Sequence, residues 1–156
     1  MAAHRSRRFW IVGTGLLVAG CQTGPPGGPA VSGTATDPCF WRLDEICGHL
    51  FDYTNRQGEL PPSLEALRAV KPAGSPPLES PESGELYVYH ARPLEMPGRP
   101  GRLLIHSPTR ARATVGGRPS RWTVLVSGLG ADQPIIAQVI LVPEREVDAA
   151  LARSSE

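Results

Sequence analysis

The sequence predicts an α+β domain: an amphipathic helix and a short second helix packed on an antiparallel sheet of about four strands, followed by a short C-terminal helix. Two observations support this. Apolar residues recur at helical spacing between residues 39 and 57, whereas after residue 85 they follow the two-residue period of strands. The strand-like segments are joined by local connections, which favour antiparallel neighbours.

The first helix is predicted from Cys39 to Gln57, with a broad apolar face opposite a charged one. Asp37 is a favoured N-cap residue, Pro38 suits the first helical position, and Gly58 is a favoured C-cap residue. In the next stretch, "ELPPSLEALRAV", the Pro-Pro pair predicts an extended turn and Ser63 caps a short second helix. Three leucines are expected to fold back on the first helix: Leu60, Leu64 and Leu67.

Four strands are predicted after the loop "KPAGSPPLESPESG". The first, "ELYVYHA", alternates Leu86, Val88 and His90 against two tyrosines. The others are "RLLIHS", "RWTVLVSG" and "PIIAQVILVP". Pro143 ends the last strand, and "EREVDAALA" predicts the closing helix.

The N-terminal 38 residues differ in character from this domain. "HRSRR" is a basic start, and "FWIVGTGLLVA" (residues 9–19) is an uncharged run. The run is shorter than the roughly 20 residues that a transmembrane helix needs, and it has the length of a signal-peptide core. Eight of residues 22–38 are Gly or Pro, a composition typical of an extended tether. We therefore expect a signal peptide over 1–20, a modified cysteine and tether over 21–38, and one domain over 39–156.

The segment "VAGC" (Val18–Cys21) resembles the lipobox of bacterial lipoproteins. The resemblance implies diacylglyceryl transfer to the Cys21 thiol, cleavage before Cys21 and acylation of the new amino terminus. Several acyl chains are consistent with stable anchoring, because one chain binds a membrane only marginally. Gln22 after the cysteine implies delivery to the outer membrane, facing the periplasm. An ordinary cleaved signal peptide is the alternative interpretation.

Cys39 and Cys47 are predicted to be buried free thiols. Eight residues of helix separate their Cα atoms by roughly 12 Å, whereas a disulfide needs about 7 Å or less. A disulfide would form only if the first helical turn were unwound.

A second resemblance is carried by "LFDYTNRQGELPPSLEAL" (Leu50–Leu67). It is similar to the end of the core helix and the following turn in pseudopilins and prepilin-like proteins of type II secretion. "LESPESGELYVYH", "TVLVSGLG" and "VILVPEREVDAAL" are similar to their later turn and strands. The resemblance implies a pseudopilin-like head over about residues 40–150. The lipobox and tether replace the prepilin cleavage motif and the long apolar helix, so polymerisation into a pilus is not expected.

No reactive group in the head points to catalysis. His90 and His106 end the first two predicted strands and could lie opposite each other, but no further ligand shows a metal-site spacing. His49 is expected in a solvated ion pair on the polar helix face. A Cys–His nucleophile would need an exposed cysteine, and both cysteines fall on the apolar face. Neither G-x-S-x-G nor a P-loop occurs. We expect no enzymatic activity, no cofactor and no metal.

Residues 92–121 hold seven arginines and one acidic residue, Glu95. They predict candidate contacts for lipid headgroups or an acidic partner, with solvated loops as the alternative. The six arginines assigned this role are Arg99, Arg102, Arg110, Arg112, Arg118 and Arg121. Loss of the three arginines of the signal leaves 13 basic and 15 acidic residues, a balance that argues against nucleic-acid binding.

These features together predict a lipid-anchored envelope protein whose head is a non-enzymatic interaction or structural module. Its partners would be the membrane, through Cys21, and an envelope or secretion-system protein. A pseudopilin-like component of a type II secretion or pilus-like assembly is the alternative.

Overall fold

The computed structural model describes residues 9–11, 37–70, 77–129 and 134–155. The residue expected to be lipidated, Cys21, and the tether up to residue 36 lie outside these ranges. The elements follow one another in this order: β1 (Phe9–Ile11), α1 (Pro38–Gln57), α2 (Leu64–Val70), β2 (Val88–Glu95), β3 (Arg102–His106), β4 (Thr114–Val115), β5 (Arg118–Ser127), β6 (Ile135–Pro143) and α3 (Glu144–Arg153). The predicted α+β class is confirmed.

Helix α1 begins and ends where its capping residues predict. The Asp37 carboxylate accepts a hydrogen bond from the Cys39 N–H at 2.8 Å, and Pro38 occupies the first helical position. At the other end, Gly58 has a φ of 78°, and its N–H donates to the Thr54 carbonyl. Ser63 caps α2 by accepting a hydrogen bond from the Ala66 N–H at 3.3 Å. None of the helices in the described part of the chain is long and apolar enough to cross a membrane.

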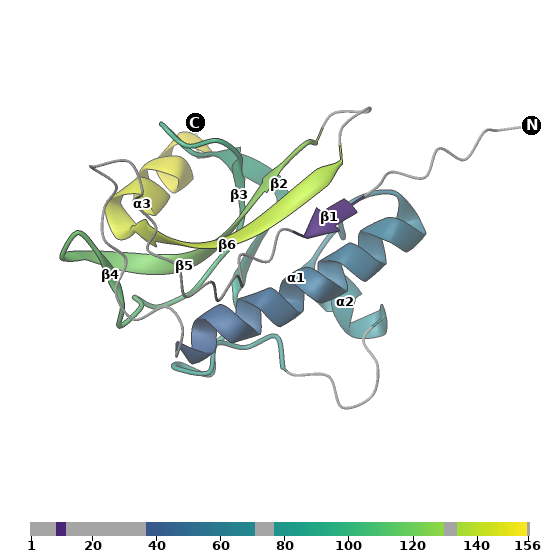
Figure 1. The fold of residues 1–156 in the computed structure, drawn as a ribbon, viewed down its shortest axis with the longest axis horizontal. Coiled ribbons are helices and arrows are strands. Elements are labelled where there is room, and N and C mark those ends of the chain that lie inside the picture. Colours follow the sequence, from purple (N-terminus) through teal and green to yellow (C-terminus); the bar gives the residue numbers. More distant parts are fainter. Residues whose placement is uncertain (1–8, 12–36, 71–76, 130–133, 156) are drawn as a thin grey trace, which may run out of the picture.

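The strands form one sheet in the order β1-β6-β5-β3-β2, with β4 paired to β5 (Figure 1). The pairs β2–β3, β3–β5 and β5–β6 are antiparallel. Gly116 and Gly117 both have positive φ values in the turn between β4 and β5, a backbone conformation that few other residues adopt. The four long strands correspond to the four predicted segments, but β2 begins at Val88 and continues to Glu95, so His90 lies near its start and not at its end as predicted.

Two short strands depart from the prediction of about four. Strand β4 spans two residues, too few for any periodicity. Strand β1 lies within the expected signal peptide and pairs in parallel with β6, with Phe9 opposite Ile135 and Ile11 opposite Ala137. A three-residue strand separated from its partner by more than a hundred residues leaves no signal in the local sequence pattern.

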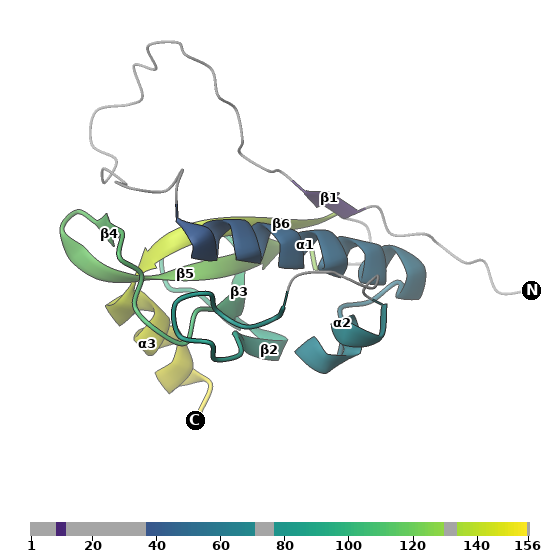
Figure 2. The same ribbon diagram turned by 90° about the horizontal axis from the view of Figure 1, so that it is seen from below.

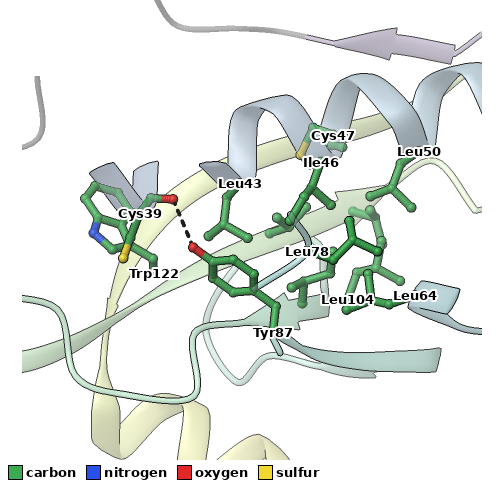
Figure 3. Close-up of a cluster of buried hydrophobic side chains, with 14 of the residues drawn as sticks. Cys39, Leu43, Ile46, Cys47, Leu50, Leu64, Leu78, Tyr87, Leu104 and Trp122 are labelled. Carbon is green, nitrogen blue, oxygen red and sulfur yellow. Dashed lines mark hydrogen bonds between the residues drawn. The ribbon is translucent and has the colours of Figure 1, made fainter. Parts of the chain in front are cut away.

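Helices cover both faces of the sheet: α1 lies across one face and α3 lies on the other (Figure 2). The larger core fills the space between α1, α2 and the sheet (Figure 3). It includes Leu43, Ile46, Leu50, Leu67, Tyr87, Leu104 and Trp122. A smaller cluster beneath α3 joins Leu103, Leu125 and Val142 to Val147 and Ala150.

Cys39 and Cys47 are both free and buried on the apolar face of α1, as their spacing predicts. Burial raises the pKa of both thiols, and nearby carboxylates add to the shift. The Tyr87 hydroxyl donates to the Cys39 backbone carbonyl at 3.4 Å and so ties the start of α1 to the segment before β2 (Figure 3).

The buried carboxylate of Asp37 links the start of α1 to the centre of the sheet. One oxygen caps the helix, and the other accepts a hydrogen bond from the Trp122 indole N–H at 2.8 Å, across 85 residues of sequence. Trp122 lies in β5 and is 1% exposed, so Asp37 is the acceptor that satisfies its N–H.

Replacing this carboxylate should destabilise the fold. We expect Asp37→Ala to lower the free energy of unfolding by about 2–4 kcal/mol, because the helix loses its cap and the buried indole N–H loses its acceptor. Asp37→Asn keeps an oxygen acceptor and should cost less. Urea unfolding measures both. The exposed Asp52→Ala on the same helix is the matched control, with an expected change within about 0.5 kcal/mol. Equal effects of Asp37→Ala and Asp52→Ala would contradict the linking role.

Candidate functional site

His90 and His106 are brought together on the side of the sheet that faces α3. Their ring centroids are 5.4 Å apart and their planes are inclined by 31°. Residues alternate between the two faces of a strand. Ile105 and Trp122 pack in the core under α1, so His106 and its neighbour Thr123 face the other way. The predicted proximity of the two histidines is confirmed.

Irregularities in the sheet accompany this pairing. His106 lies opposite Val88 of β2, and the register shifts between Tyr89 and Leu94, the stretch that contains His90. A second register shift occurs in β3 between Leu103 and Ile105. Such irregularities re-aim side chains, and they occur often beside functional sites.

Burial keeps both imidazoles neutral near pH 7. It lowers the pKa of His90, and the adjacent His106 lowers it further. Burial also lowers the pKa of His106, and the Arg121 guanidinium lowers it in addition. A hydrogen bond to the Ser107 backbone and the carboxylate of Asp148 raise this pKa and so reduce the shift. The Nε2 atoms of both rings are buried without a hydrogen-bond partner among the described residues.

A second polar cluster surrounds the start of α1. Ligand atoms of Asp37, Cys39 and Glu82 lie within 4.8 Å of one another. The Asp37 carboxylate already accepts hydrogen bonds from the helix end and from Trp122. Glu82 forms an ion pair with Arg112 at 3.1 Å. The Cys39 sulfur lies 3.6 Å from the Ser80 hydroxyl. These partners account for the cluster as a structural cap, in which burial and both acids keep Cys39 protonated.

The arginines of residues 92–121 are largely engaged by carboxylates of the same domain. Arg110 and Arg121 both bind Glu144 at the start of α3, at 2.6 and 2.7 Å. The hydrogen bond from Arg121, aided by Arg110, lowers the pKa of Glu144. Arg121 also donates to the carbonyls of Ser107 and Pro108. This network joins α3 to the end of β3.

Three further arginines are paired. Arg99 binds Glu146 at 2.6 Å, Arg102 binds Glu95 at 3.2 Å, and Arg112 binds Glu82. Arg118, at the exposed β4–β5 hairpin, has no ion pair within the described residues. The charge bias read along the sequence is therefore largely neutralised in space. Contact between these arginines and an anionic partner stays a prediction.

An open depression of about 580 Å³ lies where the β2–β3 connection approaches the end of β5. Its polar lining includes Glu95, Arg99, Arg102 and Ser127. Gly101 borders it with a φ of 102°, and a Cβ there would lie 3.2 Å from the Val126 carbonyl. Two of the predicted contact arginines, Arg99 and Arg102, therefore line the depression.

Local sequence analysis missed the acids that organise these sites. Glu82 comes from a loop, and Glu144 and Glu146 come from a helix whose exposed face is charged in any case. Nothing in their spacing distinguishes them from solvated residues. The burial of Asp37 was likewise hidden, because an N-cap residue normally faces solvent.

No protein-family model, curated protein or solved structure matches the chain significantly. The roles of His90, His106 and the arginines therefore depend on geometry and chemistry alone. The likenesses to the lipobox and to pseudopilin heads remain likenesses of short motifs.

The buried histidine pair should make the fold sensitive to mild acid. Because the folded-state pKa values lie below the unfolded value of about 6.5, the unfolded chain binds more protons as the pH falls through this region. We expect the free energy of unfolding to decrease from pH 7 to pH 5. Urea unfolding in a chelator-treated buffer measures it.

The His90→Gln/His106→Gln double variant should lose less stability over the same interval than the wild type does. Glu144 does not confuse the result, because its lowered pKa confines its contribution to more acidic conditions. An identical loss in the double variant and the wild type would contradict the assignment.

Proposed function

We propose that the protein is a lipoprotein of the cell envelope, anchored by acyl chains on Cys21, whose α+β head is a non-enzymatic interaction or structural module. The order of features at the N-terminus carries the proposal: basic residues, an apolar run, small residues, Cys21, and then a Gly/Pro-rich segment. Gln22 favours the outer membrane and the periplasmic side.

The chemistry of the head supports a non-enzymatic role. Its two thiols are buried, and the raised pKa values keep them protonated and unreactive. Five of the six candidate contact arginines bind carboxylates of the domain itself. These groups hold the elements of the head together, as expected of a binding or structural module.

The proposed mechanism is tethering. The acyl chains place the head at the membrane, and residues 22–38 let it search a limited volume, which raises its effective concentration toward neighbouring proteins. The arginines of residues 92–121 would make the contact with an anionic surface or partner. Arg118 is the best placed of the six candidate contact arginines, because it is exposed and leaves no internal ion pair broken when it binds.

The alternative is a pseudopilin-like component of a secretion or pilus-like assembly. The segment that carries the resemblance favours it: α1 ends at Gly58, a Pro-Pro turn follows, and α2 returns along α1. Tyr89 of β2 donates a hydrogen bond to the Pro61 carbonyl and holds this turn against the sheet. Such a head, anchored by lipid, would join an assembly without a polymerising helix.

Lipidation is tested by replacing the acceptor. We expect a metabolically supplied palmitate analogue to label the wild type, and Cys21→Ser to lose the label and leave the membrane fraction. Cys47→Ser is the matched control and should remain labelled, because its thiol is buried in the head. An unlabelled wild type, or label retained by Cys21→Ser, would refute the anchor.

Interaction is tested by crosslinking in cells followed by mass spectrometry. We expect a defined envelope protein to be captured by the wild type and by Arg56→Gln, and captured severalfold less by Arg118→Gln, because a charge contact is lost. Arg99→Gln is unsuitable, since it would break the pair with Glu146.

The partner's identity separates the two functions: a secretin or pseudopilins would support the secretion assembly. Equal capture by the Arg118 and Arg56 variants would rule out the arginine contact, and no capture at all would contradict the interaction module.

A further inference from the structure

We propose that His90 and His106 together bind a borderline divalent transition-metal cation, with Zn²⁺ as the representative ion. This inference goes beyond the proposed function and does not depend on lipid anchoring. It rests on the arrangement of the two rings, which lie on the side of the sheet that faces α3.

The first step concerns the tautomer of His106. Its Nδ1 lies 2.9 Å from the Ser107 carbonyl oxygen. A carbonyl oxygen can only accept, so Nδ1 carries the proton and Nε2 carries a lone pair. Metal-binding histidines are typically oriented in this way, with the other ring nitrogen donating to a carbonyl or carboxylate.

The second step concerns the lone pairs. His106 is 5% exposed, and its Nε2 is buried with no donor among the described residues. The Nε2 of His90 is also buried and unpartnered, and it carries a lone pair when the proton of the neutral ring is on Nδ1. A buried acceptor without a partner is costly, because it has lost water and gained nothing in exchange. A shared cation would satisfy both atoms.

The third step is the spacing of the rings. A zinc ion lies about 2.0–2.1 Å from an imidazole nitrogen and so about 3.2 Å from the ring centre. If both Nε2 atoms face one ion, ring centres 5.4 Å apart subtend roughly 115° at it. This angle is near that of tetrahedral coordination, the usual geometry of protein-bound zinc. Water would complete the coordination.

The charges around the pair permit a cation. The positive charge of Arg121 disfavours a cation near His106. This charge is balanced, because the guanidinium is bound by the Glu144 carboxylate at 2.7 Å and by the carbonyls of Ser107 and Pro108. The carboxylate of Asp148, on α3, raises the pKa of His106 and therefore favours positive charge there. His106 is the titratable neighbour that acts on His90. Both imidazoles are neutral near pH 7, which is the form that binds metals.

The test uses the purified mature protein in detergent, expressed without a metal-affinity tag and treated with chelator. Zn²⁺ is titrated against a chromophoric chelator, and Co²⁺ serves as a spectroscopic probe. We expect one Zn²⁺ per chain, bound at least about tenfold more weakly by His90→Gln and by His106→Gln, since loss of a ligand should exceed loss of a supporting partner. His49→Gln, which removes an imidazole from α1, should bind as the wild type does.

The Co²⁺ spectrum separates this site from the Asp37, Cys39 and Glu82 cluster. Ligation by imidazole and water gives visible d–d bands without a thiolate charge-transfer band, whereas binding through Cys39 would add that band and Cys39→Ser would remove it. His90 is half-buried on an edge strand, so His90→Gln should fold, and far-UV circular dichroism checks this. No binding by the wild type, thiolate ligation, or unchanged affinity in folded His90→Gln would each overturn the proposal.

Discussion

The hydrogen bonds of the buried Asp37 carboxylate join local helix formation to the packing of the whole domain. The same side chain starts α1 and satisfies the indole N–H of Trp122 in the middle of β5. The position of the helix on the sheet is thereby coupled to the residue at which the helix begins. Tyr87 and Ser80 add their contacts with Cys39, two residues further along the chain. The start of α1 is therefore held by contacts from β5 and from the segment before β2.

Patterns that repeat within a single element were sufficient to predict most of the fold. The caps of α1, the short α2 and the end of β6 at Pro143 all follow from local chemistry. His90 and His106 approach each other because β2 and β3 are antiparallel, which places the start of β2 beside the end of β3. Strands β1 and β4 were too short to have a period, and the Asp37–Trp122 contact depends on tertiary packing that no local window contains.

Charge provides the clearest contrast between sequence and structure. Along the chain, residues 92–121 form a basic block, but their partners Glu82, Glu144 and Glu146 come from outside that block. The ion pairs of these arginines join α3 and the loop before β2 to the sheet and its connecting loops, so the arginines do not form a free basic patch. The carboxylate of Glu144 alone connects two arginines. Among the described residues of this block, the arginines left without an ion pair are Arg92 on β2 and Arg118 at the β4–β5 hairpin, and both are exposed.

The parallel pairing of β1 with β6 bears on the proposed signal cleavage. Phe9–Ile11 cover the edge of β6 at Ile135–Ala137, yet they belong to the segment that signal cleavage would remove. A processed chain would present backbone N–H and C=O groups along that edge, which is a template for another strand. Confinement to a membrane surface would crowd such edges together, so the mature protein would be more prone to self-association than its precursor.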